Sequence, residues 1–123
     1  DVSPLNVANM LVRENDANGI KERGAFYRYE VEEPSSDQPG FVFSKPGSDV
    51  RLSVVPKAAG SEVIVTGLKD RKAVEGMLKQ YHYQKVGKNG GAIVYEAKGR
   101  GSAKPTRCEV SKGKEYMLRF FVF

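Results

Sequence analysis

Short runs of β-branched and aromatic residues, separated by Gly, Pro and Asn, fill the sequence from Phe41 onward. Such runs are typical of strands, and the residues between them are typical of turns. In the last run, residues 115–123, large β-prone side chains occupy both alternating sets of positions. This pattern predicts a central strand that is covered on both faces. The remaining runs lie at residues 41–43, 49–55, 62–65, 83–86, 92–97 and 106–111.

Three further segments have a recognisable period. Residues 70–82 place apolar side chains at helical spacing, with Asp70 as the N-cap. A short helix is predicted to begin at Ser3 and Pro4 and to stop at Asn18-Gly19. Residues 25–33 alternate in the manner of a strand.

The predicted fold is α+β: a mostly antiparallel sheet of about six to seven strands, packed with one central helix and a short N-terminal helix in a sandwich-like arrangement. A chain of 123 residues is long enough for one core, so residues 1–123 are expected to form a single domain. Residues 1–19 would be its N-terminal helical segment and residues 20–123 the sheet domain. We find no internal repeat in the sequence.

Composition excludes several classes of protein. The chain is 40% hydrophobic and 28% charged, and no apolar run approaches the roughly 20 residues that span a bilayer, so no membrane insertion is expected. The single cysteine, Cys108, excludes an internal disulfide. The chain starts at Asp1 without Met, which is compatible with a processed mature terminus or a trimmed one.

Charge is divided unevenly along the chain. Residues 1–56 carry six Lys and Arg against nine Asp and Glu, a net charge of −3, whereas residues 57–123 carry fourteen against six, a net charge of +8. Such asymmetry raises the rate of encounter with acidic surfaces. The C-terminal half is therefore the half in which a partner-binding surface is expected.

Catalytic and metal-binding patterns are weak. Glu14, Asp16, Asn18 and Gly19 resemble the opening of a calcium loop, but Ala25 stands where the closing Glu is needed, so a helix C-cap explains them better. His82 and Cys108 are the only soft ligands or nucleophiles, and Cys108 is expected to point into the sheet.

Two other patterns have simpler structural explanations. The glycine-rich stretches at 99–101 and 87–91 lack the strand-to-helix context of a phosphate loop and are expected to be hairpin turns. Glu32, Glu33 and Asp37 are expected to form a solvated acidic loop rather than a divalent-ion site. The sequence therefore predicts no enzyme activity, no metal and no cofactor.

The stretch Lys98–Lys114 is the feature with the most plausible binding role. It predicts a basic face for a partner, formed by Lys98, Arg100, Lys104, Arg107, Lys112 and Lys114. A nucleic-acid surface combines such cations with exposed aromatics that stack bases, and residues 98–105 contain no aromatic. A purely solvated loop is the simplest explanation of the stretch, and among the binding roles docking to an acidic protein is favoured over single-stranded nucleic acid.

From about Gly40 to the end, the order of elements resembles that of the PsbP-like extrinsic proteins of the thylakoid lumen. The resemblance is carried by "DVRLSVVP", by "TGLKDRKAVEGMLKQ" and by "GAIVYEAKGRGSAKPTRCEVSKGKEYMLRFFVF". The chain departs from that family at "TRCEV", where an Arg-His pair is common, and at Phe123, where a terminal helix normally follows. No binding residue of the family has a counterpart here.

This resemblance implies a non-catalytic peripheral subunit or assembly factor. It would bind a photosystem or a related membrane complex through an acidic protein surface, in the chloroplast thylakoid lumen. Without the resemblance, the sequence is equally compatible with another organellar or a cytoplasmic location. A single-stranded nucleic-acid-binding domain is the alternative function.

Overall fold

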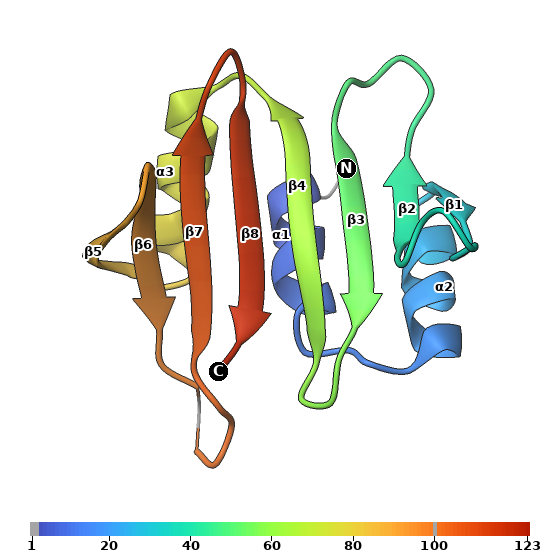
Figure 1. Cartoon of the computed structure of the whole chain (residues 1–123), viewed down its shortest axis with the longest axis horizontal. Helices are drawn as coiled ribbons and strands as arrows, with labels where there is room; N and C mark the ends of the chain where they lie inside the picture. The colour runs from blue at the N-terminus through green and yellow to red at the C-terminus, as the bar shows by residue number, and fades with distance from the viewer. Residues whose placement is uncertain (1–2, 100) are drawn as a thin grey trace.

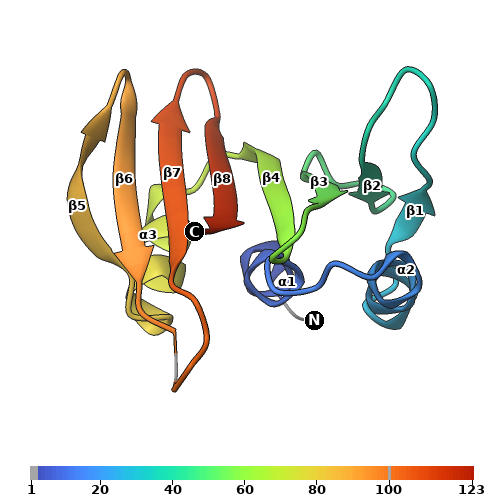
Figure 2. The ribbon, with the colours of Figure 1, turned by 60° about the horizontal axis from the view of Figure 1, so that its bottom comes forward.

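The computed structural model describes residues 3–99 and 101–123, which form three helices and eight strands. All eight strands belong to one antiparallel sheet in the order β1-β2-β3-β4-β8-β7-β6-β5, and the three helices lie on one face of it (Figures 1 and 2). The elements are α1 (Pro4–Leu11), α2 (Ala17–Phe26), β1 (Glu30–Glu32), β2 (Phe41–Ser44), β3 (Arg51–Pro56), β4 (Ser61–Leu68), α3 (Arg71–Gln80), β5 (Gln84–Asn89), β6 (Ala92–Ala97), β7 (Thr106–Lys112) and β8 (Tyr116–Val122).

The predicted class, α+β with a mostly antiparallel sheet, is confirmed, but the sheet has eight strands instead of six to seven. Helix α3 also agrees with the prediction: Asp70 is its N-cap and accepts a hydrogen bond from the Lys72 amide at 2.9 Å. Val74, Met77 and Leu78 form its buried face. The alternation of buried and half-exposed residues along β4 and β7 is that of strands covered on one face.

The N-terminal region differs from the prediction. The first helix ends at Leu11, and a second helix begins at Ala17, so Asn18-Gly19 belongs to the first turn of α2 instead of stopping α1. Asp16 caps α2 and accepts a hydrogen bond from the Gly19 amide at 3.0 Å. Only Glu30–Glu32 of the predicted strand 25–33 is a strand, because its beginning lies in α2.

The last strand is central, as predicted, but it is not covered on both faces. Leu118 and Phe120 are fully buried under the helices. On the opposite face, Met117 is 43% exposed and Phe123, just after β8, is 46% exposed. The fold is therefore a two-layer arrangement in which the described residues cover only one side of the sheet.

The sheet consists of two halves with the same topology. Each half is a helix followed by a four-stranded meander: α2 with β1–β4, and α3 with β5–β8. The pairing registers correspond as well, since Leu52↔Val65 and Val54↔Val63 in the first half match Cys108↔Phe120 and Val110↔Leu118 in the second. The halves meet at β4 and β8, where Ile64 pairs with Arg119. The structure thus has an approximate two-fold repeat that the sequence does not reveal.

Helix α1 has no counterpart in the second half. It packs against β3 and β4, with Leu5, Val7, Ala8 and Leu11 at most 1% exposed. The start of β4 holds the end of this helix, because the Ser61 amide donates to the Val12 carbonyl at 2.9 Å. Gly60 allows this close approach, since a Cβ there would collide with the same carbonyl. Two helices therefore cover the first half-sheet, and α3 covers the second (Figure 2).

Candidate docking site at the basic end of the sheet

The structure does not bring the six predicted basic residues together on one patch. Lys98 and Lys104 lie between β6 and β7 at the lower end of the sheet, while Lys112 and Lys114 lie at the β7–β8 turn at its upper end (Figure 1). The seven-residue strand β7 separates them by about 20 Å. Arg107 lies within β7, and Arg100 lies outside the described residues.

Arg107 is paired with a carboxylate and an aromatic ring on the uncovered face of the sheet. Its Nε and Nη2 atoms donate to Glu96 Oε2 at 3.0 and 2.5 Å, and its guanidinium lies 4.5 Å from the centre of the Phe123 ring. Burial alternates along β7 so that Arg107 and Glu109 face away from Cys108 and Val110, as the sequence predicts. Because its charge is already compensated by a carboxylate, Arg107 contributes little net attraction for an anion.

Arg119 has the same kind of environment one strand away. It bridges Glu62 at 2.9 Å and Glu109 at 2.8 Å, and its guanidinium lies 4.4 Å from the centre of the Phe121 ring. Although burial alone would lower the pKa of Arg119, the hydrogen bonds and charges of both carboxylates raise it overall. The uncovered sheet face is therefore a self-compensated network of arginines and carboxylates with phenylalanine between them.

A basic hollow of about 520 Å³ lies at the lower end, where α1, α3 and the β6–β7 connection meet. Arg13 from the end of α1 and Lys98 after β6 line it, together with the exposed ring of His82 and the side chains of Asn9 and Gln80. No carboxylate occurs among the described residues that line it. We call this hollow the basin.

Backbone geometry positions two of the basin residues. Arg13 Nη1 donates to the Lys104 carbonyl at 3.0 Å, which ties the end of α1 to the loop before β7. His82 has a φ of 60° and ends α3 in a Schellman motif: its amide donates to the Lys79 carbonyl, and the Tyr83 amide donates to the Leu78 carbonyl at 2.8 Å. The left-handed residue turns the chain from α3 into β5 beside the basin.

The buried Tyr83 hydroxyl forms hydrogen bonds with two residues that line the basin, Asn9 and Thr106. It donates to Asn9 Oδ1 at 3.1 Å and lies 3.0 Å from Thr106 Oγ1, so that the Thr106 hydroxyl serves as the second partner. Burial raises the pKa of Tyr83 to about 12, although the hydrogen bond from Thr106 opposes the shift. The phenol therefore stays neutral and joins α1, α3 and β7 under the basin.

Sequence reasoning found Lys98 and Lys104 but missed Arg13, and it considered His82 only as a metal or catalytic ligand. Arg13 and Lys98 come from opposite ends of the sequence, and their proximity depends on α1 crossing behind β4. No local pattern in either segment indicates this. Only knowledge of the strand order could have joined the two cations.

The other predicted chemistry can be placed as well. Cys108 is fully buried among core side chains, as predicted, and burial raises the pKa of its thiol, whereas His82 is exposed beyond the end of α3. Residues 3–99 and 101–123 contain no cluster of three or more His, Cys, Asp or Glu side chains that could hold a metal ion. Gly90, with a φ of 61°, lies in the β5–β6 hairpin turn, as expected, but residues 87–89 of the predicted turn belong to β5. The other predicted turn, 99–101, includes Arg100, which lies outside the described residues.

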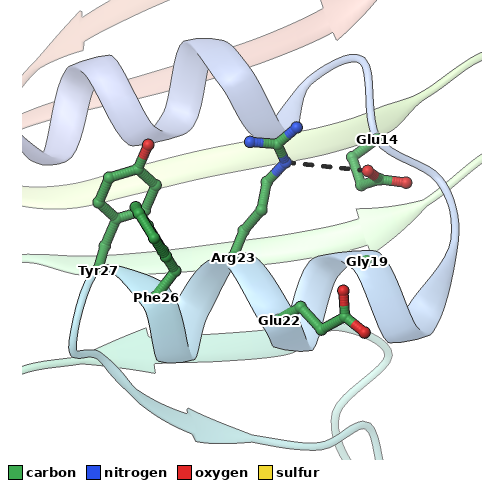
Figure 3. A pocket seen from close by; sticks show the side chains of 6 residues that line it. All are labelled: Glu14, Gly19, Glu22, Arg23, Phe26 and Tyr27. Atoms are coloured by element: carbon green, nitrogen blue, oxygen red, sulfur yellow. Dashed lines mark ion pairs between the residues drawn. The ribbon is translucent and has the colours of Figure 1, made fainter.

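A second, shallower hollow of about 350 Å³ lies on the first half of the molecule, between α2 and the α1–α2 connection (Figure 3). Arg23 Nε lies 3.8 Å from Glu14 Oε2, so both charges have a partner. Phe26 is 78% exposed, and its ring meets the Tyr27 ring edge-on at 5.0 Å between centres. This hollow offers an apolar contact but no excess of positive charge.

Among the residues that the structure describes, no helix is long and apolar enough to cross a membrane. Comparison of the chain with protein-family models, with curated proteins and with solved structures found no match.

Proposed function

We propose that this domain is a non-catalytic protein-binding module that docks an acidic protein surface onto its basic end, defined as Arg13, Lys98, Lys104 and the basin. The observation that carries the proposal is the composition of the basin. It collects cationic side chains from distant segments around a hollow of about 520 Å³, with no carboxylate among its described lining residues. Such local charge steers acidic partners and fixes their orientation.

The uncovered sheet face supports protein docking over nucleic-acid binding. Phe121 and Phe123 could stack bases, but Glu62, Glu96 and Glu109 surround them and compensate both arginines. Carboxylates on such a face repel phosphates, whereas phosphate neutralisation supplies most of the affinity of nucleic-acid binders. One cation without a carboxylate partner among the described residues, Lys98, lines a hollow of about 340 Å³ together with Phe123, but Glu96 lines the same hollow.

The ends of two helices modulate the charge of the basin. Helices α1 and α3 both end there, and carbonyl groups at helix C-termini carry partial negative charge. This charge stabilises the Arg13 guanidinium but reduces the attraction for an anion deep in the hollow. We therefore expect partner carboxylates to meet Lys98 and Lys104 at the rim, with moderate affinity that falls as salt is added.

The resemblance of residues 40–123 to PsbP-like proteins makes one partner class the first to test. We propose that the domain serves as a peripheral subunit or assembly factor on a photosynthetic membrane complex, on the lumenal side of the thylakoid. Without the resemblance, we propose only that the domain docks an acidic protein surface, whatever its compartment.

A matched pair of triple variants tests the proposal. R13A/K98A/K104A removes three exposed cations from the basic end, and K88A/K112A/K114A removes three exposed cations from the opposite end. Both have the same net charge. Binding is measured by sedimentation with salt-washed thylakoid membranes and, as a defined acidic probe, by fluorescence anisotropy with a labelled poly-glutamate peptide. We expect the first variant to bind at least tenfold more weakly and the second to stay within about twofold of the unmodified protein.

Three outcomes would contradict the proposal in different ways. Equal losses in both variants would show a response to net charge alone. Binding to the peptide without binding to the membranes would contradict the photosynthetic assignment and leave acidic docking. Tighter binding to a single-stranded oligothymidine than to either acidic probe would favour the nucleic-acid function instead.

A further inference from the structure

The strongest asymmetry between the two half-sheets lies under their helices. Counting back from the matching sequences Tyr27-Arg28-Tyr29 and Tyr81-His82-Tyr83 that follow the two helices, Gly24 of α2 corresponds to Leu78 of α3. At Gly24 a Cβ would collide with Val31 and come within 3.1 Å of the Phe43 ring, so α2 lies directly on the sheet. A leucine at the corresponding position cannot approach the sheet as closely.

The space beside Leu78 is a hollow of about 270 Å³ between α3 and the strands β6, β7 and β8. We call it the α3 slot. Its interior is apolar and aromatic, and it is lined by Val74, Leu78, Ile93, Tyr95, Val110 and Tyr116.

The strand registers show what fills the same space in the first half. Phe41↔Val54 in β2 and β3 corresponds to Ile93↔Val110 in β6 and β7. Phe41 is 3% exposed and Val54 is fully buried, while Ile93 is only half-buried. A buried phenylalanine thus closes the first half at this position, and a half-buried isoleucine leaves the second half open.

The charges at the mouth of the slot are unequal. Arg71 Nε donates to Glu75 Oε1 at 2.5 Å, so these two groups compensate each other. Lys112 has no carboxylate partner among the described residues, and its Nζ lies 5.3 Å from the centre of the Tyr116 ring at the slot wall. A ligand that places a carboxylate at the mouth and an apolar body inside would satisfy both the cation and the lining.

We propose that the α3 slot binds a small aromatic or cyclic carboxylate, with its ring between Leu78 and the two tyrosines and its carboxylate on Lys112. The volume limits the ligand to about one or two rings, because it lies just below the roughly 300–1,000 Å³ of ordinary ligand pockets. The two tyrosine rings offer edge and face contacts to such a ring. This site is separate from the basic end, which lies at the opposite end of the sheet.

The test uses 2-naphthoate as the probe and 2-naphthalenemethanol as its neutral counterpart, titrated into ¹⁵N-labelled protein and followed by amide chemical shifts. We expect saturable shifts at Ile93, Tyr95, Val110 and Tyr116, with the carboxylate binding about five- to tenfold more tightly than the alcohol. One charge-assisted hydrogen bond at an exposed mouth accounts for a difference of that size.

Two variants test separately the apolar interior of the α3 slot and the positive charge at its mouth. I93F copies the residue that fills the corresponding space in the first half, and it should weaken binding of both probes at least tenfold. K112Q should reduce the affinity for 2-naphthoate to that of the alcohol and leave the alcohol unchanged. K114Q removes a cation from the same turn without touching the slot and serves as the control, with no change expected.

The proposal would be overturned by shifts centred on Phe26 and Tyr27 instead of the slot, by equal affinities for the two probes, or by equal effects of K112Q and K114Q. Should I93F fail to fold, the K112Q and K114Q pair still decides the question. Because neither variant touches Arg13, Lys98 or Lys104, failure here would leave the docking proposal intact.

Discussion

The two half-sheets share a topology and a register but differ in how they are closed. The first half lies under α1 and α2 with a phenylalanine core at Phe41 and Phe43, and its net charge is acidic in sequence. The second half lies under α3, and the two hollows beside that helix are the basin at its C-terminal end and the slot along its N-terminal part. In the functions that we propose, the first copy of the half-sheet serves stability and the second copy serves binding.

The largest effect is expected from truncating equivalent core positions. Phe43 and Tyr95 occupy matching places, since Phe43 pairs with Leu52 and Tyr95 with Cys108. F43A should lower the free energy of unfolding by about 3–5 kcal/mol, because the ring is fully buried. Y95A should cost only about 1–2 kcal/mol, because its ring is half-exposed beside the slot. Urea denaturation of both variants measures the difference.

Equal losses in F43A and Y95A would contradict the comparison. They would mean that the second half is as tightly closed as the first and that the slot is filled in solution. The m-value provides the control, because an unchanged m-value shows that both variants unfold from the same folded state to the same denatured state.

A pair of glycines sharpens the contrast between the two helices. Gly24 faces Val31 and Phe43, so G24A should lower the free energy of unfolding by about 1–3 kcal/mol through overpacking. Gly76 of α3 has open space where a Cβ would lie, so G76A should raise it by about 0.5–1 kcal/mol through helix propensity. Thermal unfolding by circular dichroism gives the sign of each change, and a stabilising G24A would disprove the tight contact of α2 with the sheet.

Sequence patterns predicted the second half better than the first for physical reasons. Helix α3 has an N-cap and three well-spaced apolar residues, which are local signals. Helix α2 buries only Ile20 and Gly24, and the alternation of Tyr27, Tyr29 and Val31 just after it imitates a strand. Its helical state depends on contact with the sheet, which a local pattern does not contain.

The candidate sites could be predicted only in part for a related reason. Lys98 and Lys104 belong to one basic stretch of the sequence, so composition alone was enough to predict them as partner-binding cations. Arg13 joins them only because α1 and the β6–β7 connection reach the same end of the sheet. The one local trace of the repeat is the pair Tyr27-Arg28-Tyr29 and Tyr81-His82-Tyr83, in which the central residue has a positive φ in both copies. Neither pattern by itself indicates a duplicated half-sheet.

The smallest effect on stability is expected from removing the hydroxyl groups of two equivalent tyrosines, Tyr83 and Tyr29. The Tyr83 hydroxyl has Asn9 and Thr106 as partners, so Y83F should cost about 1–2 kcal/mol by leaving the buried Thr106 hydroxyl without a partner. Tyr29 has a buried hydroxyl for which the described structure contains no partner, so Y29F should change stability by less than about 0.5 kcal/mol or increase it. Equilibrium denaturation at pH 7 distinguishes the two variants.

Alkaline titration gives an independent readout of the same pair. Burial raises the pKa of Tyr83 from 10.0 to about 12, and it also raises the pKa of Tyr29. Above pH 10 the unfolded chain releases the Tyr83 proton while the folded chain keeps it, so stability falls as the pH rises from 10 to 12. The slope should be about 1.4 kcal/mol per pH unit shallower in Y83F than in the unmodified protein, because one such group is removed. Identical slopes would mean that Tyr83 is solvated in the folded state, in which case its hydrogen bonds with Asn9 and Thr106 would not exist as described.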